Sequence, residues 1–148
     1  MNQEKIRKQF LIVKSLVIDE KGRILFVRRN MEQLKEAHNK WEFPGGKIDF
    51  GESPEETAIR EAKEESGYNI EIDHLLPKII TSKWESEERE SQMILICYIC
   101  KLIGGNANLI DHGVSEIKWF NINEIPKKTE CLPGTIEFLE AYSNLQRG

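Results

Sequence analysis

Long apolar runs are missing from this 148-residue sequence. A membrane-spanning helix needs roughly 18 consecutive apolar residues, and no stretch approaches that length. The first ten residues, MNQEKIRKQF, are polar and charged and contain no apolar segment typical of a secretory signal. Internal repeats and low-complexity tracts are absent as well. The sequence therefore predicts a cytoplasmic protein without a membrane partner.

Cysteine is scarce, with only Cys97, Cys100 and Cys131. Cys97 and Cys100 form a C-x-x-C pattern, which can mark a redox or zinc site, but it lies in the apolar run MILICYIC. Side chains alternate along a strand, so residues three apart point to opposite faces, and no second pair completes a zinc site. We therefore interpret the cysteines as small core hydrophobes.

Positive charge is outweighed by negative charge: 21 lysines and arginines face 25 aspartates and glutamates, for a formal net charge of −4. Residues 51–71 alone hold seven glutamates against Arg60 and Lys63. Such a surface repels a phosphate backbone, so a long nucleic acid is not an expected partner. A small polyphosphate could approach only with metal ions interposed.

The remaining pattern predicts a single α/β domain. Strand-like segments cover 10–18, 23–29, 41–43, 92–102 and 117–121, with an extended stretch over 70–83 and a solvated acidic connection over 85–90. Residues 19–22 give the turn of a hairpin, and an amphipathic helix over 134–144 closes the chain. Strands that bracket one central helix suggest an α/β sandwich around a mixed sheet.

The clearest element is a helix that begins after Ser53. This residue is a good N-cap, Pro54 suits the first helical position, and Glu56 completes a capping box. Gly67 stands where a left-handed residue would end the helix. The signals predict a helix over 54–66, about three and a half turns long.

Three glutamates share one face of this helix, because residues three and four apart fall within an arc of roughly 100°. They are Glu61, Glu64 and Glu65, beside a modest apolar stripe of Ala58, Ile59 and Ala62. Neighbouring carboxylates repel each other, and a divalent cation would remove that repulsion. The alternative is a solvated helix face with ion pairs such as that of Arg60 with Glu64.

The surrounding spacing favours the metal. Residues 46–68, GKIDFGESPEETAIREAKEESGY, match each fixed position of one short motif: Gly46, Glu52, Arg60, Glu61, Glu64, Glu65 and Gly67. This motif resembles the Nudix box, and residues 39–67 are similar in particular to the MutT type of Nudix hydrolase. Two positions that are usually aliphatic hold Ala62 and Tyr68, which we expect to alter packing more than chemistry. The resemblance implies one Nudix domain over 1–148, folded as an α/β/α sandwich.

The resemblance also implies a metal centre that holds Mg²⁺, with Mn²⁺ as a possible substitute. The ligands carried over from the family are Glu61, Glu64, Glu65 and the backbone carbonyl of Gly45. A turn at residues 44–46 would let the backbone approach an ion closely. Arg60 and Glu52 would support the site: Arg60 by fixing neighbouring carboxylates, and Glu52 by standing before the helix start, where a negative charge suits the helix dipole.

Family members often add a fourth acid from outside the box. Glu116 is the candidate for this catalytic and metal-binding role, since Glu-x-x-Trp-Phe over 116–120 resembles the matching region of relatives. It could equally be an exposed strand residue. Glu61, Glu65 and Glu116 are all eligible as the base that activates water.

Substrate phosphates would find cationic partners outside the helix. Arg28 and Arg29 end a strand as a similar pair does in MutT-type enzymes, and alternation lets only one of them face the substrate. Lys47 follows the glycines, and Leu132 lies where the base pocket is expected. For each basic residue, surface charge is the alternative.

The resemblance implies hydrolysis of a nucleoside triphosphate, or an oxidised deoxynucleoside triphosphate, to the monophosphate and pyrophosphate. Alternatives on the same fold are pyrophosphohydrolases for ADP-ribose, nucleotide sugars or RNA 5′ ends, and a non-catalytic nucleotide sensor. A homodimer is common among relatives.

Overall fold

The computed structural model describes residues 4–147, so positions 1–3 and 148 of the expected domain lie outside the described part. Its elements are β1 (Ile6–Ile18), β2 (Ile24–Arg29), β3 (Trp41–Glu42), β4 (Gly45–Lys47), α1 (Pro54–Ser66), β5 (Tyr68–Leu75), β6 (Ile80–Glu85), β7 (Arg89–Gly105), β8 (Val114–Phe120), the short 3-10 helix η1 (Lys128–Glu130) and α2 (Thr135–Arg147). Within residues 4–147, no helix is both long and apolar enough to cross a membrane.

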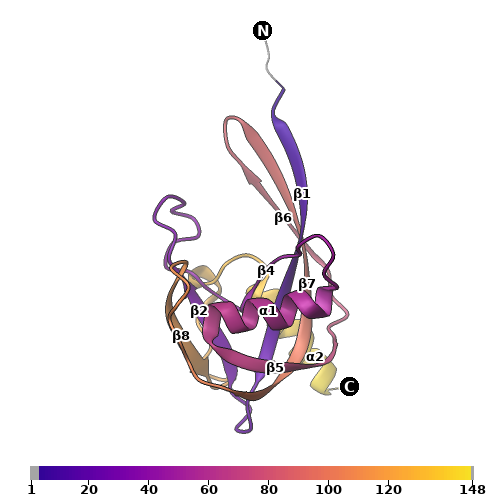
Figure 1. The fold of residues 1–148 in the computed structure, drawn as a ribbon, viewed down its shortest axis with the longest axis vertical. Coiled ribbons are helices and arrows are strands. Elements are labelled where there is room, and N and C mark those ends of the chain that lie inside the picture. Colours follow the sequence, from indigo (N-terminus) through magenta and orange to yellow (C-terminus); the bar gives the residue numbers. More distant parts are fainter. Residues whose placement is uncertain (1–3, 148) are drawn as a thin grey trace.

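The strands form one mixed sheet in the order β3-β2-β1-β7-β5, with β4 on β1, β6 on β7 and β8 on β2. Its centre is the parallel pair of β1 and β7, which runs from Ile6 opposite Arg89 to Ile18 opposite Lys101. The expected hairpin of β1 and β2 is confirmed. Beyond the helices, β1, β6 and β7 project together as an arm (Figure 1).

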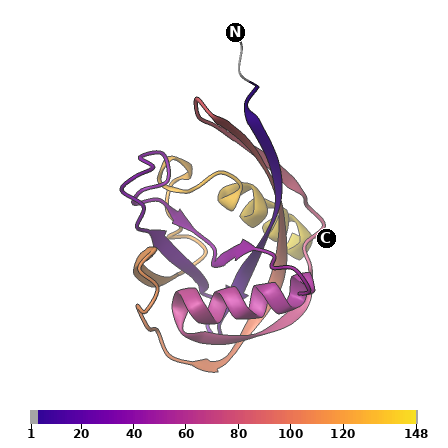
Figure 2. The ribbon, with the colours of Figure 1, turned by 45° about the horizontal axis from the view of Figure 1, so that its top comes forward.

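Alternation along the central strands creates two separate cores. Leu16 packs in one cluster with Phe138 of α2, and Val17 packs in the other with Ala58 of α1. The helices therefore cover opposite faces of the sheet, as Figures 1 and 2 show. This confirms the α/β sandwich around a mixed sheet, with β4 as an additional short strand.

Helix α1 has the predicted bounds and caps. The Ser53 hydroxyl accepts a hydrogen bond from the Glu56 amide at 3.2 Å, and the Glu56 carboxylate accepts one from the Ser53 amide at 3.1 Å. Gly67 ends the helix in a left-handed conformation with φ of 86°. The caps fix where the helix starts and stops, and therefore which residues face the sheet.

The turn expected at residues 44–46 is wrong, because Gly45 and Gly46 belong to strand β4, paired with β1. The glycines are needed for close packing rather than for a turn. A Cβ on Gly45 would collide with the Val13 carbonyl, and a Cβ on Gly46 would lie 2.6 Å from the Glu61 carboxylate. The acidic connection over 85–90 is also shorter than expected, since β6 ends at Glu85 and β7 begins at Arg89.

The C-x-x-C pair is divided between the two cores, as alternation predicts. Cys97 lies in the cluster beneath α2 and Cys100 in the cluster beneath α1, both fully buried. Burial raises the pKa of both thiols, that of Cys100 to about 12. They are protonated core residues, far from the thiolate state that metal binding or redox chemistry needs.

We predict that Gly67→Ala destabilises the fold more than Gly22→Ala. Both glycines have positive φ, 86° and 78°, so alanine is strained at either position. At Gly67 the new Cβ would also meet the Asn106 carbonyl, whereas Gly22 faces open space. Urea denaturation should give a loss of about 1 kcal/mol for Gly22→Ala and at least about 1 kcal/mol more for Gly67→Ala. Equal losses would contradict the role of the Gly67 contact.

Candidate active site

Glu65 is the most buried of the three helix glutamates, with 4% of its side chain exposed. One carboxylate oxygen accepts a hydrogen bond from the Gly45 amide at 2.9 Å, and the other accepts one from Arg29 Nη2 at 2.9 Å. Burial raises the pKa of Glu65 above its usual value. The negative charge of Glu42 adds to this rise, whereas the positive charge of Arg29 opposes it. A cation beside Glu65 would stabilise its charged form.

Arg60 organises the outer part of the same helix face. Its guanidinium donates two hydrogen bonds to Glu52, from Nε at 2.7 Å and from Nη2 at 2.9 Å. Nη1 reaches Glu61 at 2.9 Å and Glu64 at 3.2 Å. Nη2 also lies 3.2 Å from Asp49, so one planar group contacts four carboxylates.

Two charged residues of this region, Lys14 and Glu42, escaped the sequence analysis. Lys14 Nζ donates to one oxygen of Glu42, and Arg29 Nε donates to the other at 2.6 Å. Burial favours a higher pKa for Glu42, but the positive charges of Lys14 and Arg29 outweigh it and hold that pKa below its usual value. The available signal was a charge inside each of two apolar segments, LIVKSLVI and WEF.

The two arginines at the end of β2 separate as alternation predicts. Arg29 points to α1 and contacts Glu42 and Glu65. Arg28 donates to the Asn39 carbonyl at 3.1 Å and lies 3.4 Å from Glu116, its cross-strand partner. Of the two, only Arg29 joins the helix acids.

The structure does not bring Glu116 to the acids of the box. It lies directly opposite Arg28 on the neighbouring strand, and opposed residues of antiparallel strands point to the same face. Its side chain is 46% exposed and paired with Arg28. Glu116 is therefore a half-buried strand residue paired with Arg28, away from the acids of the box.

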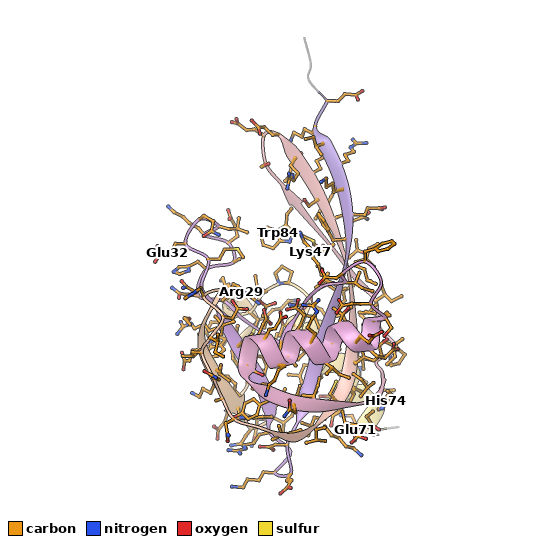
Figure 3. The ribbon with its side chains drawn as sticks, viewed as in Figure 1. Arg29, Glu32, Lys47, Glu71, His74 and Trp84 are labelled. Carbon is orange, nitrogen blue, oxygen red and sulfur yellow. The ribbon has the colours of Figure 1, made fainter. Side chains whose placement is uncertain are left out.

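A cleft of about 390 Å³ connects the acids to an apolar wall. Its charged part contains Lys14, Arg29, Glu42, Lys47, Glu61 and Glu65 with the backbone of Gly45 and Gly46, and its apolar part contains Ile12, Met31, Leu34, Ala37, Trp84, Met93, Leu95, Leu132 and Pro133. The lining of this cleft does not include three of the predicted site residues: Arg28, Glu64 and Glu116. Figure 3 shows Arg29, Lys47 and Trp84 on the side of α1 that leads to the arm.

The donor set fits a hard divalent cation. Glu61, Glu64 and Glu65 offer carboxylate oxygens from one helix face, which suit Mg²⁺. Burial raises the pKa of Glu61, and the nearby charge of Glu64 adds to that rise although Arg60 opposes it, so a dication would relieve a real electrostatic cost. Within residues 4–147, no group of three or more aspartate, glutamate, histidine or cysteine side chains is arranged so as to hold a metal ion. The box carboxylates pair instead with Arg29 and Arg60.

Comparison with known proteins identifies the family. Residues 9–142 match the family model described as the NUDIX domain, and the chain belongs to the Nudix family. It is 30% identical over 115 residues to an ADP-ribose pyrophosphatase of Methanocaldococcus jannaschii. The matched region covers 75% of this chain and 62% of that protein. It is 38% identical over 74 residues to an 8-oxo-dGTP diphosphatase of Escherichia coli, covering 49% of this chain and 54% of that protein.

The fold is shared with solved Nudix structures. A MutT Nudix hydrolase of Burkholderia pseudomallei superposes with a TM-score of 0.75 at 22% identity, over 90% of this chain and 97% of the other. The chain spans less than two thirds of the length of either curated relative. The family and the MutT-like fold are therefore established, and the substrate is a separate question.

We predict that the stabilising effect of Glu52 depends on pH. The Arg60 hydrogen bond is the largest cause that lowers the pKa of Glu52 from 4.5 to about 2. A carboxylate with a lowered folded pKa stabilises the fold above its unfolded pKa and loses that effect as the pH falls towards the folded value. The difference in unfolding free energy between the wild type and Glu52→Gln should therefore shrink from about pH 6 to about pH 3.

Urea denaturation across that range measures this difference. Glu140→Gln, a change at an exposed position of α2, is the control for the loss of one carboxylate. A difference for Glu52→Gln that stays constant with pH would contradict the ion pair with Arg60.

Proposed function

We propose that this protein is a Mg²⁺-dependent pyrophosphohydrolase that cleaves a nucleoside triphosphate, or an oxidised deoxynucleoside triphosphate, to the monophosphate and pyrophosphate. The observation that carries the proposal is the cleft in which Glu61 and Glu65 stand beside an apolar wall. A nucleotide has the same two parts, a polyanionic chain and a flat apolar base. Mn²⁺ is a possible substitute for Mg²⁺.

Glu61, Glu64, Glu65 and the Gly45 carbonyl would hold the metal, which supplies charge neutralisation for the diphosphate when bound. Arg29, Lys14 and Lys47 line the cleft as cationic partners for phosphate oxygens. Arg60 keeps Glu61 and Glu64 oriented through its hydrogen bonds. Binding and orientation of an inert phosphoanhydride account for much of the catalysis that such a site can provide.

Water attack at phosphorus needs a group that removes a proton from the water. Glu61 and Glu65 are the candidates, because their carboxylates line the cleft that would hold the phosphate chain. The water oxygen forms the new bond to phosphorus, its proton passes to the carboxylate, and the bond to the leaving phosphate oxygen breaks. The electron pair of that bond leaves with the leaving phosphate group.

The alternative substrates stay within one reaction type. ADP-ribose is favoured by the 30% identity to a protein named for that substrate, whereas the MutT-like context of residues 39–67 favours triphosphates. Nucleotide sugars and RNA 5′ ends are further candidates. A non-catalytic nucleotide sensor is the remaining alternative, and the complete acidic set of the box argues against it.

We propose the cytoplasm as the setting, with a nucleotide or another nucleoside-diphosphate-linked small molecule as the partner and no long nucleic acid. A homodimer is a further prediction, which light scattering of the purified chain would test.

A substrate panel tests the proposed function. The purified chain with Mg²⁺ is given the deoxynucleoside triphosphates, 8-oxo-dGTP, CTP, ADP-ribose and capped RNA, and both pyrophosphate and orthophosphate are measured. Pyrophosphate from a triphosphate is the expected result. Faster turnover of ADP-ribose than of any triphosphate would show that ADP-ribose is the substrate. No turnover of any compound with either Mg²⁺ or Mn²⁺ would contradict the proposal that the protein is an enzyme.

Glu64→Gln should lower turnover about 10²- to 10³-fold while the fold persists, because it removes one charge of the metal site without changing shape. The side chain is 54% exposed, so the substitution leaves no buried group unpaired. Steady-state kinetics and circular dichroism measure the two effects.

Glu71→Gln is the matched control, an exposed glutamate of β5 at the end of the molecule away from Trp84 and Lys47 (Figure 3). It should retain wild-type turnover. Near-normal activity of Glu64→Gln would disprove the metal assignment.

Trp84→Ala should raise the KM for a nucleoside triphosphate about tenfold, since an aromatic ring stacked on a base contributes roughly 1–3 kcal/mol. Trp84 is half-buried in the apolar wall of the cleft and comes from the arm rather than from the box. Trp84→Phe should keep most of the affinity. An unchanged KM in Trp84→Ala would place the base elsewhere.

A further inference from the structure

Four charged side chains form a buried cluster at the inner end of the cleft. Lys14 and Arg29 are 12% and 13% exposed, and Glu42 and Glu65 are each 4% exposed. Only Glu65 belongs to the box. The cluster holds two cations and two anions, so it is neutral as a whole.

Glu42 occupies the middle of this cluster. One of its oxygens accepts from Lys14 Nζ and the other accepts from Arg29 Nε at 2.6 Å, so both are used. Arg29 is shared in turn, because its Nη2 lies 2.9 Å from Glu65. The other oxygen of Glu65 accepts from the Gly45 amide, and Arg29 is therefore the group that competes with any cation for Glu65.

We propose that Glu42 is a positioning residue that engages Lys14 and shares Arg29 with Glu65, so that neither cation is committed to Glu65 alone and this carboxylate can take part in binding a divalent cation. The inference rests on the proposed function and concerns the same cleft. Glu42 is fixed in place by β3, where it lies directly opposite Val27 on β2. Arg29 stays divided between two carboxylates, and its guanidinium remains in the cleft for a phosphate oxygen.

Charge balance gives the expected result of removing Glu42. In Glu42→Gln, Lys14 and Arg29 would face the single carboxylate of Glu65, with a surplus positive charge in a buried region. Arg29 would then pair with Glu65 alone, since an unpaired buried charge is costly. The pairing of Glu65 with Arg29 and the surplus positive charge would both weaken the binding of a divalent cation.

A purely stabilising role for this ion pair is the competing explanation. Buried ion pairs are weak stabilisers, and replacement by apolar groups is often tolerated. A role in stability alone would leave metal affinity unchanged in a folded variant. Metal affinity, measured without nucleotide, therefore separates the two explanations.

The test is titration of the full chain with Mn²⁺ alone, followed by electron paramagnetic resonance of the free ion. Glu42→Gln should weaken Mn²⁺ binding about 10- to 100-fold, the usual effect of losing a residue that orients a metal ligand. The double variant Arg29→Met with Glu42→Gln restores the charge balance and removes the competitor, so its Mn²⁺ affinity should return close to that of the wild type. Its hydrolysis should stay impaired, because Arg29 is missing.

Asp19→Asn is the matched control. Asp19 is also a poorly exposed carboxylate, at 6%, and is paired with Arg23, but it lies in the turn between β1 and β2. It should bind Mn²⁺ like the wild type even if it is less stable. Arg29→Met alone provides a second measurement should Glu42→Gln not fold, and it should bind Mn²⁺ more tightly than the wild type.

Three results would overturn the inference. These are wild-type affinity in Glu42→Gln, a double variant as weak as Glu42→Gln, or weaker binding in Arg29→Met. If the wild-type chain hydrolyses nucleotides and binds Mn²⁺ but Glu42→Gln binds it equally well, only the role of Glu42 is wrong. If the wild type binds no Mn²⁺, both this role and the proposed function are wrong.

Discussion

The contact of α1 with the sheet is the constraint on which the site depends. Ala58 and Ala62 are fully buried one helical turn apart, and their small side chains let the helix lie close to β1, β4 and β5. That contact fixes the rotation of the helix, and the caps fix its ends. Glu61 and Glu65 consequently line the same cleft at a defined edge. A helix free to rotate would present the same glutamates to water.

The charged residues around the cleft determine which ligands it can bind. Acids are concentrated on one helix, and three cations neutralise them and Glu42: Arg60 belongs to the helix itself, whereas Arg29 comes from β2 and Lys14 from β1. The outer acids stay close to solvent, whereas Glu65 and Glu42 are buried with their partners. A polyanionic substrate with a divalent cation would enter a region whose charges are already balanced and oriented.

Local signals in the sequence predicted the helix and its glutamates, because caps, periodicity and spacing act over a few residues. The separation of Cys97 and Cys100 followed from strand alternation in the same way. The sheet order, the strand at Gly45 and the Lys14–Glu42 pair could not be predicted, since each depends on contacts between distant segments. Glu116 was a sequence candidate because of its neighbours, but its cross-strand pairing with Arg28 gives it a different environment.

A crystal structure of the full chain with Mg²⁺ and a non-hydrolysable nucleoside triphosphate would test the central claim most directly. The account predicts metal density between the carboxylates of Glu61, Glu64 and Glu65 and the phosphate chain, with the base against the apolar wall that contains Trp84 and Leu132. A nucleotide bound outside this cleft, or a metal held without the helix carboxylates, would contradict it.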